Sequence, residues 1–339
     1  MLESFYIRNY RLFQELKINS LRRVNLIIGK NNVGKSSLQE AICTYLYKDQ
    51  IADSIYSTSY YRGEWIGNDF APLKIQKSIM AMYNRNVILN QRSNAIYIGS
   101  DEQIGISFYL GNTDNRKTQP ALIVEDNQKS VQSIPLSNFQ SYLSSSLVEK
   151  HNIVASSSPS DFINTLSSSW SEIALTDKED YVVEALQVID KNIERLTFIK
   201  DDTFSTEKAI VKLRNISKPV SLGSMGDGVV KILRAVINLV RCENGTLLID
   251  EFENGLHWSV QVELWKIIYR LAEKLNVQIF ATTHSQDTIW ALHKAALSEK
   301  REKDTRVVKL KLTKKQMIKA VELDVEDIEA ALDQGFEIR

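Results

Sequence analysis

The chain has 339 residues, a length that predicts one large domain with an insertion or two domains. Its 42 basic and 42 acidic residues cancel, so overall charge points to no particular partner. Cys43 and Cys242 lie far apart without a CxxC motif, so neither a disulfide framework nor a cysteine zinc site is indicated. No apolar run is long enough for a membrane span and no signal-peptide pattern opens the chain, so we expect a cytoplasmic protein.

The first fifty residues predict two short strands, a buried strand and a helix. Residues 2–8 and 14–19 alternate around a turn at Asn9–Leu12. VNLII, Val24–Ile28, is a short apolar run that ends in glycine, which is typical of a buried strand. From Lys35 to Tyr47 the apolar residues recur at helical spacing.

The middle of the chain, roughly 51–214, has a different character. Residues 141–171 contain SSS three times, a composition that favours exposed loops or poorly ordered segments. A long amphipathic helix is expected at Glu179–Leu196. Strand-like segments precede the serine-rich run at Ala95–Gly99, Ile104–Leu110 and Ala121–Val124.

From Ser221 onward, helix and strand patterns alternate. The order is the helix GDGVVKILRAVINLV, the strand TLLID, the helix SVQVELWKIIYRLAEKL and the strand VQIFATTH, followed by a strand at Arg306–Leu312 and a polar helix to about Gln334. This alternation predicts an α/β fold with a largely parallel sheet flanked by helices, together with an antiparallel β portion. We expect one core made of 1–50 and 215–339, divided by an inserted mixed and helical region at 51–214.

GKNNVGKS, Gly29 to Ser36, fits the phosphate-loop pattern G-x-x-x-x-G-K-[ST] and lies between a buried strand and a helix. Its backbone N–H groups would face phosphate oxygens, and the helix N-terminus adds partial positive charge. Lys35 would reach the β- and γ-phosphates, while Ser36 would bind magnesium. An incidental glycine turn is the rival interpretation. The expected cofactor-binding residues are Gly29, Lys30, Asn31, Asn32, Val33, Gly34, Lys35, Ser36 and Ser37.

LLIDEFENGLH, Leu247–His257, places two adjacent carboxylates at the end of an apolar run. A strand beside the phosphate loop would end at the sheet edge where ligands of such folds bind. Asp250 would hold magnesium through water, and Glu251 would orient the attacking water as general base. Taken alone, the pattern also fits a strand that ends at a solvated turn; the phosphate loop makes the catalytic interpretation the stronger one.

IFATTHS, Ile279–Ser285, is another strand that ends in polar residues. His284 at its tip would donate to the γ-phosphate and act as a catalytic sensor, although most histidines at strand ends are hydrogen-bonded surface residues. His257 is a further candidate for the nucleotide site. His151 and His293 have no such context, and we expect them to be structural.

These motifs resemble the ABC-type ATPase heads of the RecF/SMC kind, and most closely the OLD (overcoming lysogenization defect) family. The segments YIRNYRLFQELKI and VNLIIGKNNVGKSSLQEAI are similar to the first lobe, LLIDEFENGLH to the Walker B and D-loop, and FATTHS to the switch histidine. SLGSMGDGVVKIL is similar to the signature motif, which implies nucleotide contacts for Ser224, Gly226, Asp227 and Gly228. The resemblance covers 1–50 and 215–339, and it implies ATP and Mg²⁺ as cofactors and a head-to-tail homodimer or higher oligomer.

Other positions follow from the same resemblance. His257 stands where many ABC proteins have an aspartate and OLD-like members often have a histidine. Arg11 is expected to contact nucleotide, and Gln91 is the candidate Q-loop glutamine. OLD proteins also carry a C-terminal TOPRIM nuclease. The 55 residues after His284 are too few for one, and the acidic DVED, Asp324–Asp327, has a helical pattern. We therefore expect the ATPase part without its nuclease.

Three functions remain open at this point. The first is a sensor or scaffold ATPase, slow or regulated, of a bacterial anti-phage defence system that works with a separately encoded effector, most naturally a nuclease. The second is a DNA-repair or DNA-structure ATPase, supported by eight basic residues against three acidic ones in Glu299–Lys315. That run also fits a solvated strand with its turns. The third is a nucleotide-binding regulatory subunit with slow turnover.

Overall fold

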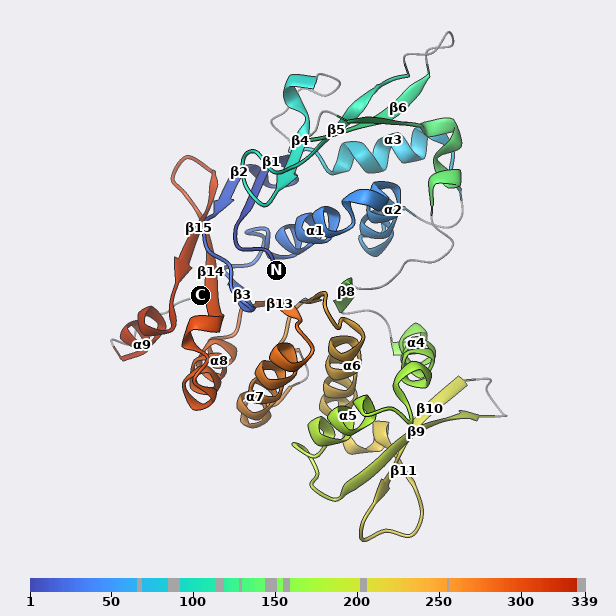
Figure 1. Cartoon of the computed structure of the whole chain (residues 1–339), viewed down its shortest axis with the longest axis vertical. Coiled ribbons are helices and arrows are strands. Elements are labelled where there is room, and N and C mark those ends of the chain that lie inside the picture. The colour runs from blue at the N-terminus through green and yellow to red at the C-terminus, as the bar shows by residue number, and fades with distance from the viewer. Residues whose placement is uncertain are drawn as a thin grey trace.

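The main sheet supplies the framework of the molecule (Figure 1). The structure is a computed structural model that describes residues 1–65, 69–84, 92–113, 119–127, 130–143, 151–154, 159–201, 206–254 and 256–333. Within these residues the sheet has six strands. They run parallel, except that the strand at one edge is antiparallel to its neighbour. In spatial order they are β15 (Ile318–Leu323), β14 (Thr305–Leu312), β3 (Val24–Ile28), β13 (Gln278–Thr283), β12 (Thr246–Ile249) and β8 (His151–Val154).

The central strands are apolar on both faces because each face lies against a different core. In β3, Leu26 and Ile28 belong to one hydrophobic cluster, whereas Ile27 between them belongs to the other. In β12, Leu247 and Leu248 divide in the same way. Neighbouring side chains of a strand point to opposite faces, so a strand covered on both sides is a continuous apolar run. That is why VNLII and TLLI could be recognised as buried strands.

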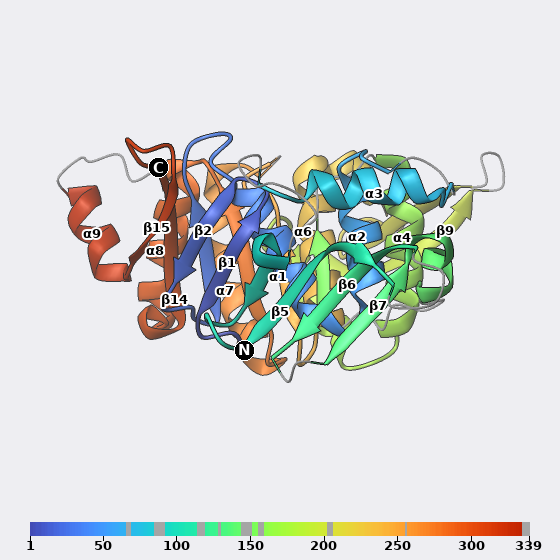
Figure 2. The same cartoon turned by 90° about the horizontal axis from the view of Figure 1, so that it is seen from above.

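An antiparallel sheet covers one side of the molecule. Figure 2 looks onto this sheet and shows its labelled strands side by side from β2 to β7. Helix α1 (Lys35–Leu46) lies between the two sheets, and its apolar side chains join a core that both sheets share (Figure 1). In spatial order the described strands are β2 (Phe13–Ile18), β1 (Phe5–Tyr10), β4 (Ile96–Gly99), β5 (Gly105–Asn112), β6 (Pro120–Asp126) and β7 (Val131–Pro135).

The opposite face of the main sheet is covered by the helices α6 (Asp227–Arg241), α7 (Trp258–Lys274) and α8 (Gln286–Glu299) (Figure 1). A small sheet of β9 (Ile193–Asp201), β10 (Thr206–Leu213) and β11 (Val220–Ser221) lies beyond α6, with α5 (Lys178–Leu186) beside it. The remaining described elements are α2 (Ile51–Tyr61), α3 (Pro72–Ala81), α4 (Pro159–Ile173), α9 (Val325–Asp333), and the short 3₁₀ helices η1 (Lys48–Gln50), η2 (Arg92–Asn94), η3 (Leu136–Tyr142), η4 (Leu222–Met225) and η5 (Glu302–Asp304).

The expectation of exposed loops at 141–171 is wrong for most of the described part of that segment. Residues 151–154 form β8, which pairs in parallel with β12 and completes the main sheet. Residues 159–173 form α4, whose Leu166 and Trp170 are buried in the core beside α6. Serines occupy the positions between the apolar residues, so the composition concealed a helix with one buried side.

Two further expectations need correction. The expected helix at Glu179–Leu196 is the shorter α5, and Leu196 lies in β9. The expected polar helix of the C-terminal part is preceded by a strand, because residues 318–323 form β15 and pair with β14 in an antiparallel hairpin. That strand has Lys319 and Glu322 among its apolar residues and therefore lacks the continuous apolar run of a central strand. Among the described residues no helix is both long and apolar enough to cross a membrane.

Candidate nucleotide site

The phosphate loop joins β3 to α1, and its backbone requires glycine at two positions. Gly29 has φ 147°, and a Cβ there would lie 2.7 Å from the carbonyl oxygen of Leu310. Gly34 has φ 97°, directly before the first residue of α1, and a Cβ there would meet the ring of Phe13 at 2.8 Å. Only glycine adopts such angles without strain, so both positions fix the path of the loop.

The Lys35 ammonium lies inside this loop. Its Nζ donates to the carbonyl oxygens of Gly29 at 2.8 Å and Lys30 at 3.2 Å. Burial lowers the pKa of Lys35, and the carboxylates of Asp250, Glu253 and Glu251 oppose that lowering. The three acids are therefore close enough to affect the ammonium electrostatically. The ends of β3 and β12 thus contribute to one site.

Asp250 is tied to the first turn of α1 and to the end of β13. Its Oδ2 accepts from the Ser36 hydroxyl at 3.1 Å, and its Oδ1 accepts from the Thr282 hydroxyl at 2.5 Å. Two hard oxygen atoms from Ser36 and Asp250 suit Mg²⁺, which takes few protein ligands when phosphates and water complete its shell. No cluster of three or more His, Cys, Asp or Glu side chains suited to a metal occurs in the described ranges.

Glu251 follows Asp250 in the left-handed region, with φ 50°. Its backbone N–H donates to the Thr282 hydroxyl at 2.8 Å, and one carboxylate oxygen accepts from the Asn254 side-chain amide. The carbonyl of Asn254 in turn accepts from the ammonium of Lys231 on α6. A non-glycine residue at positive φ persists only where surrounding contacts hold it. The carboxylate of Glu251 is exposed at the sheet edge.

His284 lies directly after β13 and contacts a carboxylate that sequence reasoning missed. Both its backbone N–H and its ring Nδ1 lie near Glu253 Oε1, at 3.0 and 2.9 Å. The ring is about half exposed, while the Glu253 side chain is mostly buried. No sequence signal pairs these two residues, because they are 31 positions apart.

The signature residues lie on a different part of the chain. Ser224 is exposed in η4, and its hydroxyl donates to the Ser221 carbonyl at 2.7 Å. Gly226 has φ 105° and open space around its α-carbon, while Asp227 and Gly228 begin α6. The η4 segment packs against α6, β10 and β11, and Figure 1 shows β10 and β11 well away from α1.

Three other candidates have local structural partners or lie outside the described residues. His257 caps α7, because its ring nitrogen accepts from the Ser259 backbone N–H. Arg11 is buried and paired with Glu64 and Glu40, and its expected nucleotide contact stays a prediction. Gln91 lies outside the described residues.

Arg62 is a second residue that sequence reasoning missed. It donates to the Ser37 hydroxyl at 3.1 Å and pairs with Glu40 at 2.5 Å, next to the first turn of α1. Residue 62 follows the last residue of α2. A cation placed there adds positive charge near the end of the phosphate loop, and no sequence motif marks it.

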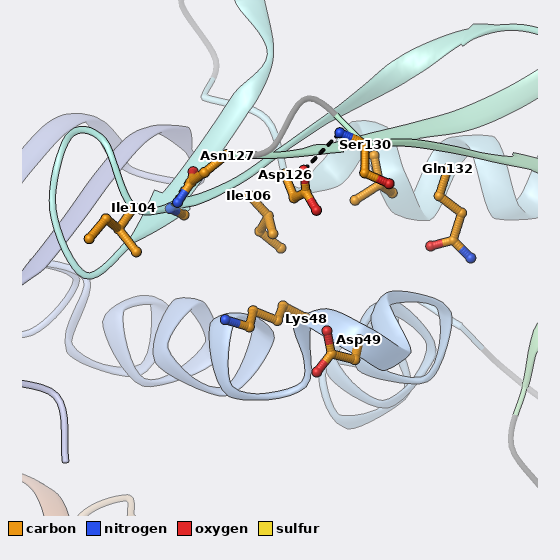
Figure 3. Close-up of a pocket in the computed structure, with 10 residues that line it drawn as sticks. Lys48, Asp49, Ile104, Ile106, Asp126, Asn127, Ser130 and Gln132 are labelled. Atoms are coloured by element: carbon orange, nitrogen blue, oxygen red, sulfur yellow. Dashed lines mark hydrogen bonds between the residues drawn. The ribbon is translucent and has the colours of Figure 1, made fainter.

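Two cavities were compared with this site. One of about 510 Å³ adjoins the phosphate loop and is lined by Lys30 to Val33 and Lys309 to Leu312. The other, of about 270 Å³, lies between η1 and the β5–β6 hairpin, at the far end of α1 from the loop (Figure 3). In that second cavity the Asp126 side chain accepts from the Ser130 backbone N–H at 2.8 Å, so it shapes a turn. We assign the second cavity no chemistry.

Comparison with known proteins supports the nucleotide site. A family model described as "AAA domain, putative AbiEii toxin, Type IV TA system" matches residues 24–289. A relative named ATP/GTP phosphatase, from Helicobacter pylori (strain ATCC 700392 / 26695), is 26% identical over 348 residues, 90% of each chain. An uncharacterized protein of Methanocaldococcus jannaschii is 28% identical over 120 residues, 28% of this chain and 55% of the relative.

The fold has a counterpart among solved structures. An SMC head, crystallised with the C-winged helix domain of ScpA, superposes with a TM-score of 0.54 at 11% identity. The match covers 96% of this chain and 98% of that chain. It confirms the predicted α/β fold of an ABC-type ATPase head, with the phosphate loop after a central strand.

Proposed function

Because the chain belongs to this AAA domain family, we propose that its nucleotide site hydrolyses ATP and that the hydrolysis drives a molecular switch. The observation that carries this proposal is the hydrogen-bonded chain from Ser36 through Asp250 to Thr282. It joins the phosphate-loop helix to the ends of β12 and β13, so one sheet edge holds both the phosphate loop and the catalytic carboxylates.

Each residue of the site has one task in this mechanism. The loop amides and Lys35 bind the β- and γ-phosphates, because they place positive charge around them. Glu251 orients the attacking water and accepts its proton. His284 donates to the γ-phosphate and holds it in place. Mg²⁺, held by Ser36 and Asp250, would neutralise phosphate charge.

Replacing Lys35 tests the proposal. Lys35→Ala should abolish ATP binding and phosphate release, because it removes the ammonium that is held inside the phosphate loop. Lys48→Ala is the matched control: it removes an exposed lysine just beyond the other end of α1. Calorimetric titration with ATP and GTP, followed by a phosphate-release assay, gives both readouts. Unchanged affinity in Lys35→Ala would remove this lysine from the site.

We further propose that two copies dock head-to-tail around ATP. Ser224 and Gly226 would then cover the γ-phosphate bound by the partner's phosphate loop. Their exposure supports this arrangement, because nothing in the described part of the chain covers them. Two equivalent interfaces of this kind form a closed, symmetric dimer.

We propose that the switch serves bacterial defence as an OLD-like sensor that controls a separate effector, with a nuclease as the favoured type. The toxin–antitoxin description of the family supports such a role. Expression of the chain with its flanking genes should lower phage plating efficiency, and Lys35→Ala should abolish that protection. Protection that persists in Lys35→Ala would separate the defence role from the ATPase.

Direct action on nucleic acid is the alternative, and the structure weakens its main support. In the basic run, Arg301 pairs with Glu273 and Arg306 pairs with Asp324. Six lysines remain, and three of them, the exposed Lys311, Lys314 and Lys315, lie near the β14–β15 turn. Salt-dependent DNA binding that is lost when these three lysines are replaced would favour the alternative.

A further inference from the structure

We propose that Glu253 is a positioning residue for His284, and this inference rests on the proposed ATPase function. Glu253 Oε1 lies 3.0 Å from the backbone nitrogen of His284 and 2.9 Å from its Nδ1. That oxygen atom thus accepts from the main chain of His284 and lies within ion-pair distance of its ring. The two contacts together restrict both the position of the chain and the rotation of the imidazole.

This contact also decides which ring nitrogen carries a proton. An ionised carboxylate only accepts hydrogen bonds, so Nδ1 must be the protonated nitrogen where it meets Glu253. Nε2 is then the nitrogen offered to the nucleotide. A hydrogen bond donated by Nε2 to the γ-phosphate then requires a proton on that nitrogen as well.

The burial of Glu253 argues against an incidental contact. Its side chain is only 12% exposed, and Oε2 is buried without a hydrogen-bond partner among the described residues. Burying a carboxylate with an unsatisfied oxygen is costly. A neutral side chain could accept the backbone N–H of His284 at lower cost, so the charge itself needs a reason. Lys35 and the His284 ring are the groups in the site that gain from it.

A purely structural role makes a different prediction from a positioning role. If Glu253 only ties the end of β13 to the loop after β12, its loss lowers stability and affects ATP binding and turnover together. If it positions His284, its loss lowers turnover with little change in ATP affinity, since Lys35 and the loop amides remain. The effect must also disappear when His284 is absent.

A double-mutant cycle measures this dependence. Glu253→Ala should lower the turnover number by about 10- to 100-fold, the scale found when the carboxylate partner of a metal-bound histidine is removed. Glu253→Gln keeps an acceptor for both donors but removes the charge, so it should recover only part of the loss. In a His284→Ala background, Glu253→Ala should have no further effect, because coupled residues are not additive. Additive losses, or equal losses in Glu253→Ala and Glu253→Gln, would overturn the proposal.

A second measurement needs no activity. Nitrogen NMR of the imidazoles, with the His284 signals identified by their absence in His284→Ala, reports the protonated nitrogen of the neutral ring. Wild-type protein should show His284 protonated at Nδ1, and Glu253→Ala should release the ring to a tautomer mixture. An unchanged tautomer in Glu253→Ala would show that Glu253 does not set it.

The two measurements separate the inference from the proposed function. Wild-type protein that binds ATP but releases no phosphate would contradict the ATPase, and the NMR comparison would still decide the role of Glu253. Wild-type turnover with a normal Glu253→Ala variant would contradict the positioning role alone.

Discussion

Asp250 and Glu251 are adjacent in the chain, yet different groups hold their carboxylates. Asp250 accepts from two hydroxyls, Ser36 and Thr282, which fixes it beside the phosphate loop. Glu251 is held by the Asn254 amide, and its carboxylate remains exposed. The positive φ of Glu251 turns the chain between the two acids, so they face different parts of the site. We infer that they divide the work between metal binding and water activation.

Replacing the two acids should therefore produce different defects. Glu251→Gln keeps size and hydrogen bonding but removes the proton acceptor, so it should bind Mg-ATP and lose turnover by about 10²- to 10⁴-fold. Asp250→Asn should instead weaken the magnesium dependence, because it removes a charge beside the metal. Turnover is titrated against magnesium in both variants. An equal loss of magnesium response in the two would contradict the division.

At the scale of elements, Gln39 ties the phosphate-loop helix to the strands that carry the acids. Its side-chain amide is buried and donates to the carbonyls of Ile249 at 2.8 Å and Phe280 at 3.0 Å. Ile249 immediately precedes Asp250, and Phe280 lies in the strand that ends directly before His284. One side chain of α1 thus sets the spacing of three elements, and phosphate binding at α1 is mechanically linked to both catalytic strand ends.

Helix α4 shows that the serine-rich segment belongs to the core. Trp170→Ala should lower the free energy of unfolding by about 3–5 kcal/mol, because it leaves a cavity where a large side chain is 5% exposed. Ser171→Ala, on the exposed side of the same helix, should change it by less than about 0.5 kcal/mol. Denaturant titration of both variants gives the comparison. Equal free energies of unfolding in the two variants would show that α4 does not contribute to the folded core.

At the scale of the whole molecule, the phosphate loop and the signature residues lie in separate regions. The loop is held between the two large sheets, whereas η4 belongs to the region of β9–β11 beyond α6. A single copy therefore offers its nucleotide site and its exposed Ser224 to different neighbours. Lys231 on α6 bonds to the loop that follows Glu251, so the proposed docking at the start of α6 would have a direct route to Glu251, the proposed base.

Mixing two inactive variants tests this arrangement. Ser224→Arg should bind ATP but neither dock nor turn over, because a bulky cation fills the position above the partner's γ-phosphate. Mixed with Lys35→Ala, it should regain activity, since each heterodimer then contains one intact composite site. Phosphate release and light scattering are measured as the mixing ratio varies. Normal hydrolysis by Ser224→Arg alone would rule out the cross-protomer site.

The local parts of the site could be predicted from the sequence because the residues that form them are consecutive in the chain. The phosphate loop needs only a strand, a glycine turn and a helix start, and the structure has β3, Gly29, Gly34 and α1 in that order. The same holds for the buried strands, since burial on both faces makes them continuous apolar runs. These features depend on short-range pattern and backbone chemistry alone.

Only the tertiary structure decided which distant residues meet. Residues 151–154 join the main sheet because β12 offers them an edge, and their own composition gave no sign of it. Glu253 meets His284 because β12 and β13 are neighbours in register, which brings side chains 31 positions apart within hydrogen-bond distance. Arg62 reaches Ser37 in the same way, through the packing of α2 on α1. Such contacts depend on how elements pack, and packing is a property of the whole fold that no short stretch of sequence contains.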